Sequence, residues 1–473
     1  MRSRVLAAIA VLLGACASDP PPPIDDDLGI ELPDEWATPP AEPIEGAVAL
    51  DWWRMFGDRR LDALVELSLQ NNRNLRGSAA RFAAAAAAWR IAGAPLLPEV
   101  DVGLTRNRSR LLFIGFPFGS GGVPSSTFGT YGLSLNVRWE LDVWGRLRSA
   151  DRAALADQQA ALEDLQAAQS SLAGQVCRTW FAAVEARLQL ELANATAKAF
   201  AQTLSDVRDR FRHGVRPALD VHQAATNLAN AEASAAQRRD QLQRILRQLD
   251  VLIGRYPNGE FAIADALPSD LAPVPAGLPG ELLRRRPDLR AAERRVAAAG
   301  CRVSAAEAAL YPRLSLTGSA GTQSTDLEDL VDTDFRVWSL GVNLLQPLFR
   351  SGALRAEVTR QQALRAQALA GYGDAVLNAF REVEELLQSE VELAARHEHL
   401  ARASEHAAAA RDLARERWQL GLADFLAVAD GQRRAFQAEA ARITAWRQRI
   451  DNRIDLLLAL GGGYGDPTAQ GQE

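Results

Sequence analysis

The chain has 473 residues, of which 48% are hydrophobic and 24% charged, and its formal net charge is −6. A mildly acidic protein whose positive side chains are almost all arginine lacks the charge distribution of a nucleic-acid-binding protein. With only Met1 and Met55, the chain also lacks the methionine-rich path expected of a copper or silver conduit.

The first 15 residues are predicted to be an export signal. Arg2 and Arg4 precede an apolar run from Val5 to Leu13, which is far shorter than the roughly 20 residues that a membrane-spanning helix needs. Removal of this segment with its arginines would lower the net charge from −6 to −8.

A cysteine follows this apolar run directly. Leu13-Gly14-Ala15-Cys16 resembles the lipobox of bacterial lipoproteins. The resemblance implies that the Cys16 thiol carries a diacylglycerol and that the new N-terminus is acylated, because several acyl chains together make a stable membrane anchor. Ala17, in place of an aspartate, implies the outer membrane by the sorting rules of such lipoproteins. An ordinary signal peptide with a coincidental cysteine is the alternative.

Residues 16–57 are predicted to form an extended tether. Runs such as Pro20–Pro23 and Asp25–Asp27 leave this segment too little apolar surface to fold alone. In the rest of the chain, no apolar run of about 20 residues predicts a transmembrane helix.

Two cysteines remain after Cys16. Nothing in the spacing of Cys177 and Cys301 suggests a metal site. Because Cys177 falls in a helical pattern where valine or alanine would serve equally well, we expect two unpaired, buried thiols, with a disulfide as the alternative.

The mature chain repeats itself with a period of about 207 residues. Arg210–Val215 corresponds to Arg417–Leu422, and Ile253-Gly254 corresponds to Leu460-Gly461. Each repeat is predicted to run as helix, strand, loop, strand, very long helix, tight turn and long helix. The predicted divisions are a first repeat over residues 58–260, a second over 261–461 and a C-terminal tail over 462–473.

A very long helix is predicted from Arg146 to about Arg212. This segment has no proline and is rich in alanine, glutamate, glutamine and arginine, which all favour helix. At 1.5 Å per residue it would be about 100 Å long, roughly three times the diameter of a small domain. The return helix carries an apolar seam in steps of three and four, which predicts coiled-coil packing. The seam comprises Leu228, Ala231, Ala235, Leu242, Ile245, Leu249 and Leu252, matched in the second repeat by Ile443, Trp446, Ile450, Ile454 and Leu457.

A glycine follows the very long helix in each repeat. Gly214 and Gly421 stand where the chain must reverse into the return helix. Glycine readily adopts the positive φ that ends a helix in this way. These glycines are therefore predicted to mark the tips of two helical hairpins.

Residues 131–143 alternate between apolar and polar side chains, which is typical of a strand with one apolar face. Leu135 and Val137 belong to one face, and Ser134 and Asn136 to the other. Segments of about ten residues with this alternation suit a transmembrane β-barrel. Further strands are predicted around residues 100–110, 314–316 and 338–344.

Four strands are too few to close a barrel, which needs at least about eight. The apolar strand faces also have no other predicted core nearby. Several copies of the chain must therefore combine, and this conclusion depends on no resemblance to a known family.

Together these features resemble the TolC-like outer-membrane factors, in particular their lipidated OprM/NodT-type branch. The resemblance extends from Asp51-Trp52-Trp53 to Leu458-Ala459-Leu460-Gly461 and includes Arg284–Glu293 and Leu310-Tyr311-Pro312. It implies a mainly α fold with β-strands, in which a homotrimer shares a twelve-stranded barrel and a long periplasmic tunnel of helices. A belt of shorter helices would come from residues near 58–75 and 278–286 and from the C-terminal tail.

The implied function is a passive exit duct in the outer membrane. Small molecules such as drugs would reach it from a periplasmic adaptor protein and an inner-membrane efflux pump, often a proton-driven one. The hairpin tips at Gly214 and Gly421 would receive the adaptor. The family implies no catalytic residue, no metal and no cofactor apart from the lipid on Cys16.

The periplasmic constriction of the family matches a stretch of the second return helix. Asp430 falls on the constriction aspartate, Leu426 on the apolar gate ring, and Arg433 on a basic residue that braces the gate. The match departs from the TolC protein at Ala427, where that protein has a second aspartate, and at Trp418, where it has a gating tyrosine. By spacing alone, Asp430 would be a polar residue on a solvated helix face.

Three other classes of protein are alternatives. An enzyme is disfavoured because the chain has no G-x-S-x-G, P-loop or H-E-x-x-H motif, and the imidazoles of His397 and His399 point to different helix faces. A periplasmic adaptor would have one helical hairpin flanked by glycine-rich β modules. An outer-membrane component of a type I protein secretion system would share the architecture, although lipidation and the Arg-Arg-Pro-Asp stretch favour efflux.

Overall fold

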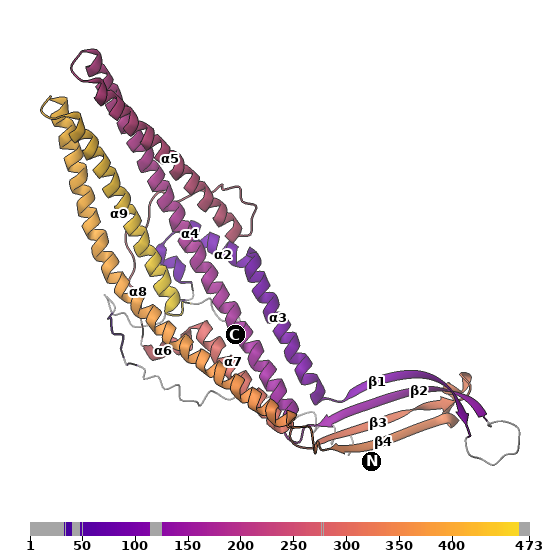
Figure 1. Cartoon of the computed structure of the whole chain (residues 1–473). Coiled ribbons are helices and arrows are strands. Elements are labelled where there is room, and N and C mark those ends of the chain that lie inside the picture. Colours follow the sequence, from indigo (N-terminus) through magenta and orange to yellow (C-terminus); the bar gives the residue numbers. More distant parts are fainter. Residues whose placement is uncertain are drawn as a thin grey trace. The chain divides into compact units, whose positions relative to one another are not determined.

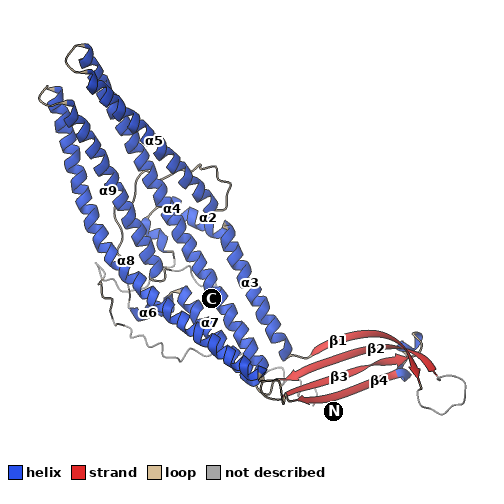
Figure 2. Ribbon diagram, in the orientation of Figure 1, coloured by secondary structure: helices blue, strands red, loops and turns tan. Residues whose placement is uncertain are grey.

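The computed structural model describes residues 33, 35–39, 48–49, 51–113, 125–275, 277 and 279–462. The predicted signal peptide, Cys16, most of the tether and most of the C-terminal tail lie outside these residues. Figures 1 and 2 show the order of helices and strands along the chain. In the first half the elements are η1 (Trp52–Phe56), α2 (Arg59–Asn71), α3 (Arg73–Gly93), η2 (Ala94–Leu96), β1 (Glu99–Leu112), β2 (Ser125–Leu141), α4 (Arg146–Arg212) and α5 (Ala218–Leu252). In the second half they are α6 (Pro279–Arg285), α7 (Pro287–Ala308), β3 (Arg313–Ser324), η3 (Glu328–Val331), η4 (Thr333–Phe335), β4 (Arg336–Leu345), α8 (Ala353–Gln419) and α9 (Phe425–Ala459).

The very long helix predicted from Arg146 is confirmed, since α4 ends at Arg212. α4 and α8 have 67 residues each, and α5 and α9 have 35 residues each. Neither α4 nor α8 contains proline, so no missing backbone donor interrupts them. Each half of the chain thus contributes one hairpin of a very long and a shorter helix (Figure 1).

Both hairpin tips have the geometry that the glycines predicted. Gly214 has φ 72° and Gly421 has φ 76°. The Gly214 N–H donates to the Phe211 carbonyl and the Val215 N–H to the Arg210 carbonyl, each over 2.9 Å, and the same pair of bonds is present at Gly421. This Schellman arrangement satisfies carbonyls that the end of a helix would leave without partners.

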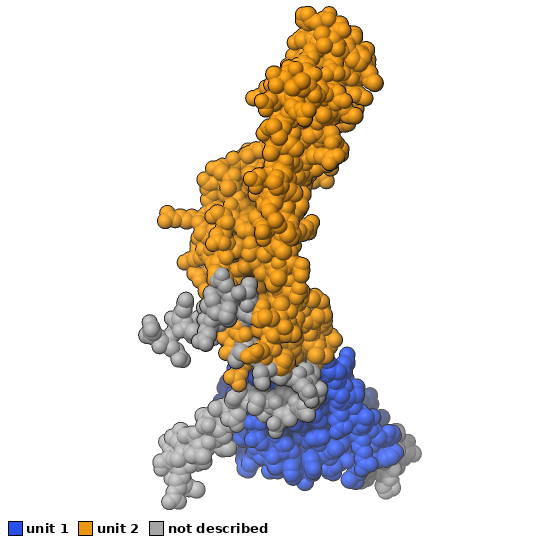
Figure 3. Space-filling model, turned by 90° about the vertical axis from the view of Figure 1, so that its left-hand side faces the viewer, with its two compact units in different colours: residues 1–28, 82–161, 292–372 blue, residues 29–81, 162–291, 373–473 orange. Residues whose placement is uncertain are grey.

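The chain divides into two compact units, coloured in Figure 3. One unit contains residues 1–28, 82–161 and 292–372, and the other contains residues 29–81, 162–291 and 373–473. Each unit takes segments from both halves of the sequence, because the strands of both halves pair in one unit and the hairpin tips of both halves lie in the other.

The first unit holds an antiparallel sheet in the order β1-β2-β3-β4. One row across it joins Val102, Leu135, Ala320 and Trp338. Along each strand apolar side chains return at every second position, so they gather on one side, which we name the apolar face. This face is not covered, since Val102 is 74% and Trp338 80% exposed. The predicted alternation of these strands is therefore confirmed.

The connection from sheet to helix is held by side chains within the same unit. The rings of Trp144 and Tyr311 stack with centroids 5.0 Å apart, and the Trp144 indole N–H donates to the Pro312 carbonyl over 2.8 Å. Arg146 pairs with Glu140 over 2.8 Å. These contacts join the end of β2 to the start of β3 and orient the first turn of α4.

The second unit buries four of the seven predicted seam residues of α5. Ala231, Ala235, Leu242 and Leu249 are buried as expected, whereas Leu228 and Leu252 are only partly buried. Leu246 is buried where Ile245 was expected. Leu246 joins a core cluster with Leu242, and Ile245 packs only at its margin. Because a helix has 3.6 residues per turn, Ile245 and Leu246 both lie near the face of α5 that contacts the neighbouring helix. The sequence pattern alone therefore does not show which of the two is buried.

The described part of the tether is attached to α8. Trp36 is buried, its indole N–H donates to the Gly277 carbonyl over 3.0 Å, and its ring lies 6.1 Å from that of Phe380. The backbone N–H groups of Ala37 and Thr38 donate to the Glu384 carboxylate over 2.7 and 3.1 Å. We call this attachment the tether clasp.

Cys177 and Cys301 are both free and buried, as predicted. Burial raises the pKa of each thiol above its ordinary value. Among the residues that the structure describes, none of the helices is both long and apolar enough to cross a membrane.

Candidate channel gate

The hairpin tips meet around a buried tryptophan. Trp418, near the end of α8, is 2% exposed. It belongs to a small core with members from both hairpins, so it joins the tip of the first hairpin to the tip of the second. The other buried members of this core are Leu204, Val207, Ala224, Phe425 and Val428.

Arg210 strengthens this junction. Its guanidinium lies 4.0 Å from the centroid of the Trp418 ring and donates to the Trp418 carbonyl over 3.1 Å and to the Gln419 carbonyl over 3.4 Å. Arg216 donates to the Ala423 carbonyl over 3.5 Å. The Trp418 and Gln419 carbonyls at the end of α8 thus accept hydrogen bonds from a cation. A positive charge at this end of the helix also interacts favourably with the negative end of the helix dipole.

α9 begins immediately after an aspartate. The Asp424 carboxylate accepts a hydrogen bond from the Ala427 N–H over 3.3 Å and so caps the helix. Phe425, the first helical residue, is buried in the tip core. The cap and the buried ring together fix the start of α9, which determines where the following side chains point.

Buried contacts then hold α9 between its neighbours. The Gln432 amide donates to the Thr203 hydroxyl of α4 over 3.0 Å, and both side chains are buried. On another side, a methyl group at Gly431 would lie 3.3 Å from the Cα of Arg411 in α8. α9 is thus held closely by both long helices in the turn that carries Asp430.

Asp430 is held by two arginines of its own helix. The nearest oxygen of its carboxylate lies 2.5 Å from the Arg433 guanidinium, and the other oxygen lies 2.6 Å from that of Arg434. The hydrogen bond from Arg433, followed by the charge of Arg434, holds the pKa of Asp430 below its ordinary value. Asp430 is therefore ionised at neutral pH, and the group of three carries one net positive charge.

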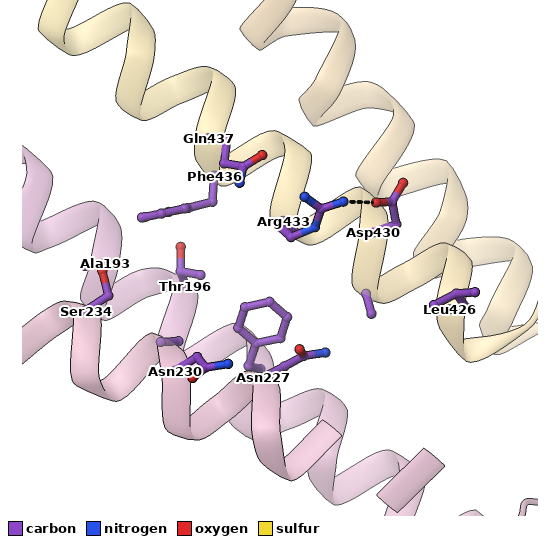
Figure 4. A pocket seen from close by; sticks show the side chains of 13 residues that line it. Ala193, Thr196, Asn227, Asn230, Ser234, Leu426, Asp430, Arg433, Phe436 and Gln437 are labelled. Atoms are coloured by element: carbon purple, nitrogen blue, oxygen red, sulfur yellow. Dashed lines mark hydrogen bonds and ion pairs between the residues drawn. The ribbon is translucent and has the colours of Figure 1, made fainter. Parts of the chain in front are cut away.

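Asp430 and Arg433 line a cavity of about 380 Å³ that α4, α5 and α9 form together (Figure 4). Leu426 is 67% exposed and lies one turn before Asp430, toward the hairpin tip. Arg433 and Phe436 follow on the same side of α9. The opposite wall, from α4 and α5, is lined by Thr196, Phe200, Asn227, Asn230 and Ser234.

The structure brings together the three residues that the resemblance assigned to a gate. Leu426, Asp430 and Arg433 share one cavity wall. Trp418 does not line this cavity, because its ring fills the tip core. The sequence interpretation missed Arg434, although its spacing of four from Asp430 is that of a helical ion pair and was available as a signal.

The hydrogen bond between Gln432 and Thr203 could not be predicted from the sequence pattern. These positions are 229 residues apart, and nothing in either helix pattern indicates which faces meet. Among the described residues, no group of histidine, cysteine and carboxylate side chains is suited to hold a metal ion.

Relatives of known type match almost the whole chain. A family model described as outer membrane efflux protein matches residues 64–255 and 278–462. The pyoverdine export outer membrane protein OpmQ of Pseudomonas aeruginosa is 32% identical over 468 residues, which cover 98% of this chain and 97% of that protein. Outer membrane protein OprJ of the same organism is 32% identical over 469 residues, which cover 96% and 95%. The toluene efflux pump outer membrane protein TtgF of Pseudomonas putida is 31% identical over 421 residues, which cover 89% and 87%.

Solved structures agree with these relatives. The outer-membrane channel OprN superposes with a TM-score of 0.87 at 30% identity, covering 95% of this chain and 100% of that chain. The open state of the Neisseria gonorrhoeae MtrE outer membrane channel superposes with a TM-score of 0.81 at 26% identity, covering 95% and 99%. The chain therefore belongs to the outer membrane efflux protein family and is an efflux channel with the TolC-like fold.

Proposed function

We propose that three copies of this chain form the exit duct of a tripartite efflux system, through which small molecules cross the outer membrane passively. The observation that carries this proposal is the sheet. In the described residues β1 and β4 each pair with one strand only, so each leaves one edge without hydrogen-bond partners. Pairing β4 of one copy with β1 of the next would satisfy both edges, and three copies would supply enough strands for a closed barrel.

The exposure of the apolar face supports a hydrocarbon surrounding. Trp338, Leu340 and Val102 are each about three-quarters exposed, in neighbouring rows of one sheet. A continuous apolar surface of this kind is unfavourable in water and typical of a contact with lipid or protein. On the other face, Ser134 and Asn136 of β2 and Ser319 of β3 offer a polar lining.

A lipid on Cys16 would give a second attachment to the same membrane. Cys16 is 20 residues before Trp36, and an extended chain of that length spans up to about 70 Å. The tether clasp would transmit the attachment to α8. Labelled palmitate should enter the mature protein, and Cys16→Ser should abolish the label; unchanged labelling of that variant would rule out the lipid.

We further propose that the cavity wall on α9 is the closed gate of the duct. Threefold symmetry would bring three Asp430 carboxylates toward one axis, with Leu426 as an apolar ring one turn nearer the tips. Each Asp430 is paired with Arg433 and Arg434 of its own helix, so the ring as a whole would be net positive. These pairs would fix the carboxylates in the constriction, and the apolar Leu426 ring would resist wetting.

The hairpin tips are proposed to receive the periplasmic adaptor, which connects the duct to an inner-membrane pump. Val215 beside Gly214, and Leu420 and Leu422 beside Gly421, are 64–68% exposed. Apolar side chains that surround tight turns offer a surface for a protein partner.

The experiment that tests the duct is light scattering on the mature protein in detergent, followed by conductance in planar bilayers. The proposal expects one species of about three times the monomer mass that forms stable channels. A folded monomer, or a trimer without channel activity, would contradict it.

A further inference from the structure

The apolar face of β1 changes its chemistry halfway along the strand. Val100, Val102 and Leu104 are followed, at the same alternate positions, by Arg106, Arg108 and Arg110. All three arginines are exposed. In β4, Arg336 precedes Trp338 by two positions, so it also belongs to the apolar face and is likewise exposed. We name these four side chains the arginine rim; they are Arg106, Arg108, Arg110 and Arg336.

The rim begins where the apolar band ends. In β2 the band extends from Leu141, next to α4, to Tyr131, and Tyr131 pairs directly with Arg106. Ten residues of strand span about 33 Å, or about 25 Å of membrane thickness at the tilt of membrane strands, which equals the usual apolar band of such barrels. The Arg106 guanidinium lies 5.3 Å from the Tyr131 ring centroid, so a cation and an aromatic ring share this margin.

The margin is the one distant from the helices. β1 begins at Glu99, directly after α3 and η2, and Arg106–Arg110 come later, toward the connection that leads into β2. In the proposed duct the long helices extend into the periplasm, so the rim would lie on the side of the outer leaflet. This placement rests on the proposed function.

No carboxylate of the strands neutralises the rim. The apolar-face positions of the four strands contain no aspartate or glutamate, because Glu99, Asp101 and Glu140 fall at the alternate positions. In the described part of the chain, no rim arginine forms an ion pair; Arg110 donates to the Ser125 hydroxyl over 2.9 Å. Asp329, in the connection between β3 and β4, instead accepts a hydrogen bond from Ser324 over 2.6 Å.

We infer that the arginine rim binds the phosphate groups of a phosphorylated glycolipid of the lipid A type in the outer leaflet. Guanidinium groups bind phosphate through two parallel hydrogen bonds, and acyl chains attached to such a headgroup would cover the apolar band below. β1 and β4 are the two edges of the sheet, so Arg106–Arg110 of one copy and Arg336 of the next converge where the copies pair. The trimer would thus carry one phosphate site at each seam between copies.

The test compares two variants from which the same number of arginines is removed. Arg106→Gln with Arg108→Gln reduces the rim. Arg138→Gln with Arg313→Gln is the control, because these arginines lie on the polar face of the strands. Purified mature trimers are titrated with diphosphoryl lipid A, with its dephosphorylated form and with phosphatidylcholine, at low and high salt.

The inference expects the parent and the control to bind diphosphoryl lipid A in preference to both other lipids, more weakly at high salt. The rim variant should bind it roughly 25-fold more weakly, since each of the two arginines near an anionic lipid surface contributes about fivefold. Equal binding by the rim variant, or an equal loss in the control, would overturn the inference.

Two further measurements keep the result interpretable. If the rim variant does not assemble, Arg108→Gln with Arg110→Gln, farther from the apolar band, replaces it under the same expectation. Channel conductance of the parent is recorded in parallel. If the parent conducts and all variants bind lipid A equally well, only the inference about the arginine rim is overturned. If the parent forms no channels, the proposed function is contradicted.

Discussion

The guanidinium of Arg210 lies 4.0 Å from the centroid of the Trp418 ring and donates to the Trp418 carbonyl over 3.1 Å. These residues are 208 positions apart, near the ends of α4 and α8. The contact therefore joins the tips of hairpins that belong to different halves of the chain. A cation over an indole contributes about 0.5–2 kcal/mol, depending on how dry the contact is.

Replacing Arg210 by alanine should loosen the tips. Because the tips then lose one of the contacts that join them beside the Trp418 core, we expect longer and more frequent open intervals of single channels in planar bilayers. Arg212→Ala is the control, since Arg212 is exposed and pairs with Asp209 of its own helix over 3.2 Å. Equal open probability in both variants would show that Arg210 does not hold the tips closed.

Leu135→Arg should destabilise the sheet in lipid, because Leu135 belongs to the exposed apolar face. An arginine near the middle of the bilayer costs about 2–4 kcal/mol. The neighbouring Ser134→Arg places the same side chain on the polar face and should change the unfolding free energy much less. Urea unfolding in vesicles measures both, and equal losses would argue against a lipid-facing apolar face.

Asp451 should make stability depend on pH between about 4 and 6. Burial raises its pKa to about 6 from the ordinary 3.8, although Arg447 opposes the rise. The folded state therefore keeps a proton that the unfolded state releases, and this contribution, at most about 3 kcal/mol, is lost as the pH rises through 6. Relative to Asp451→Asn, the parent should lose thermal stability between pH 4 and pH 7.

Asp412→Asn provides a control of opposite sign for that measurement. The hydrogen bond from Arg411 lowers the pKa of Asp412, so its contribution is present at neutral pH and is lost as the pH falls. If the melting temperatures of the parent and of Asp451→Asn differ by the same amount at every pH, the expected titration of Asp451 is contradicted.

Glu384→Gln should release the tether clasp. The Glu384 carboxylate accepts two backbone hydrogen bonds, from Ala37 and Thr38, and a neutral amide has only one good acceptor to replace them. We expect faster proteolysis near residue 36 with the trimer mass unchanged. Glu385→Gln, which removes only an exposed pair with Arg381, should be cleaved like the parent; equal protection of both variants would show that the clasp is not held by Glu384.

Much of this fold can be predicted from local patterns. The helix from Arg146 to Arg212, the glycine turns at Gly214 and Gly421 and the alternation of β2 each depend on neighbours a few residues apart. Such neighbours determine helix length, turn type and the side of a strand. The positions of Leu426, Asp430 and Arg433 on one helix face follow from the same periodicity.

Contacts between distant segments could not be predicted in this way. Gln432 bonds to Thr203, and Trp36 bonds to Gly277, because particular faces meet after the chain has turned several times. Trp418 could be aligned with a gate position of related channels, yet its ring fills a core. Whether the side chain at an aligned position is exposed or buried depends on residues that are distant in sequence, and the local pattern does not identify them.

The most direct test of the duct and its gate is the single-channel conductance of Asp430→Ala with Arg433→Ala in planar bilayers. Removing the carboxylate also ends its pair with Arg434, so every ion pair recorded for Asp430 is lost. Asp240→Ala with Arg244→Ala removes an exposed pair of the same charges from α5 and is the control. We predict higher conductance and vancomycin entry into cells for the gate variant only, with Leu426→Ala adding to both. A gate variant that forms trimers yet conducts and excludes vancomycin like the parent would contradict the proposed gate.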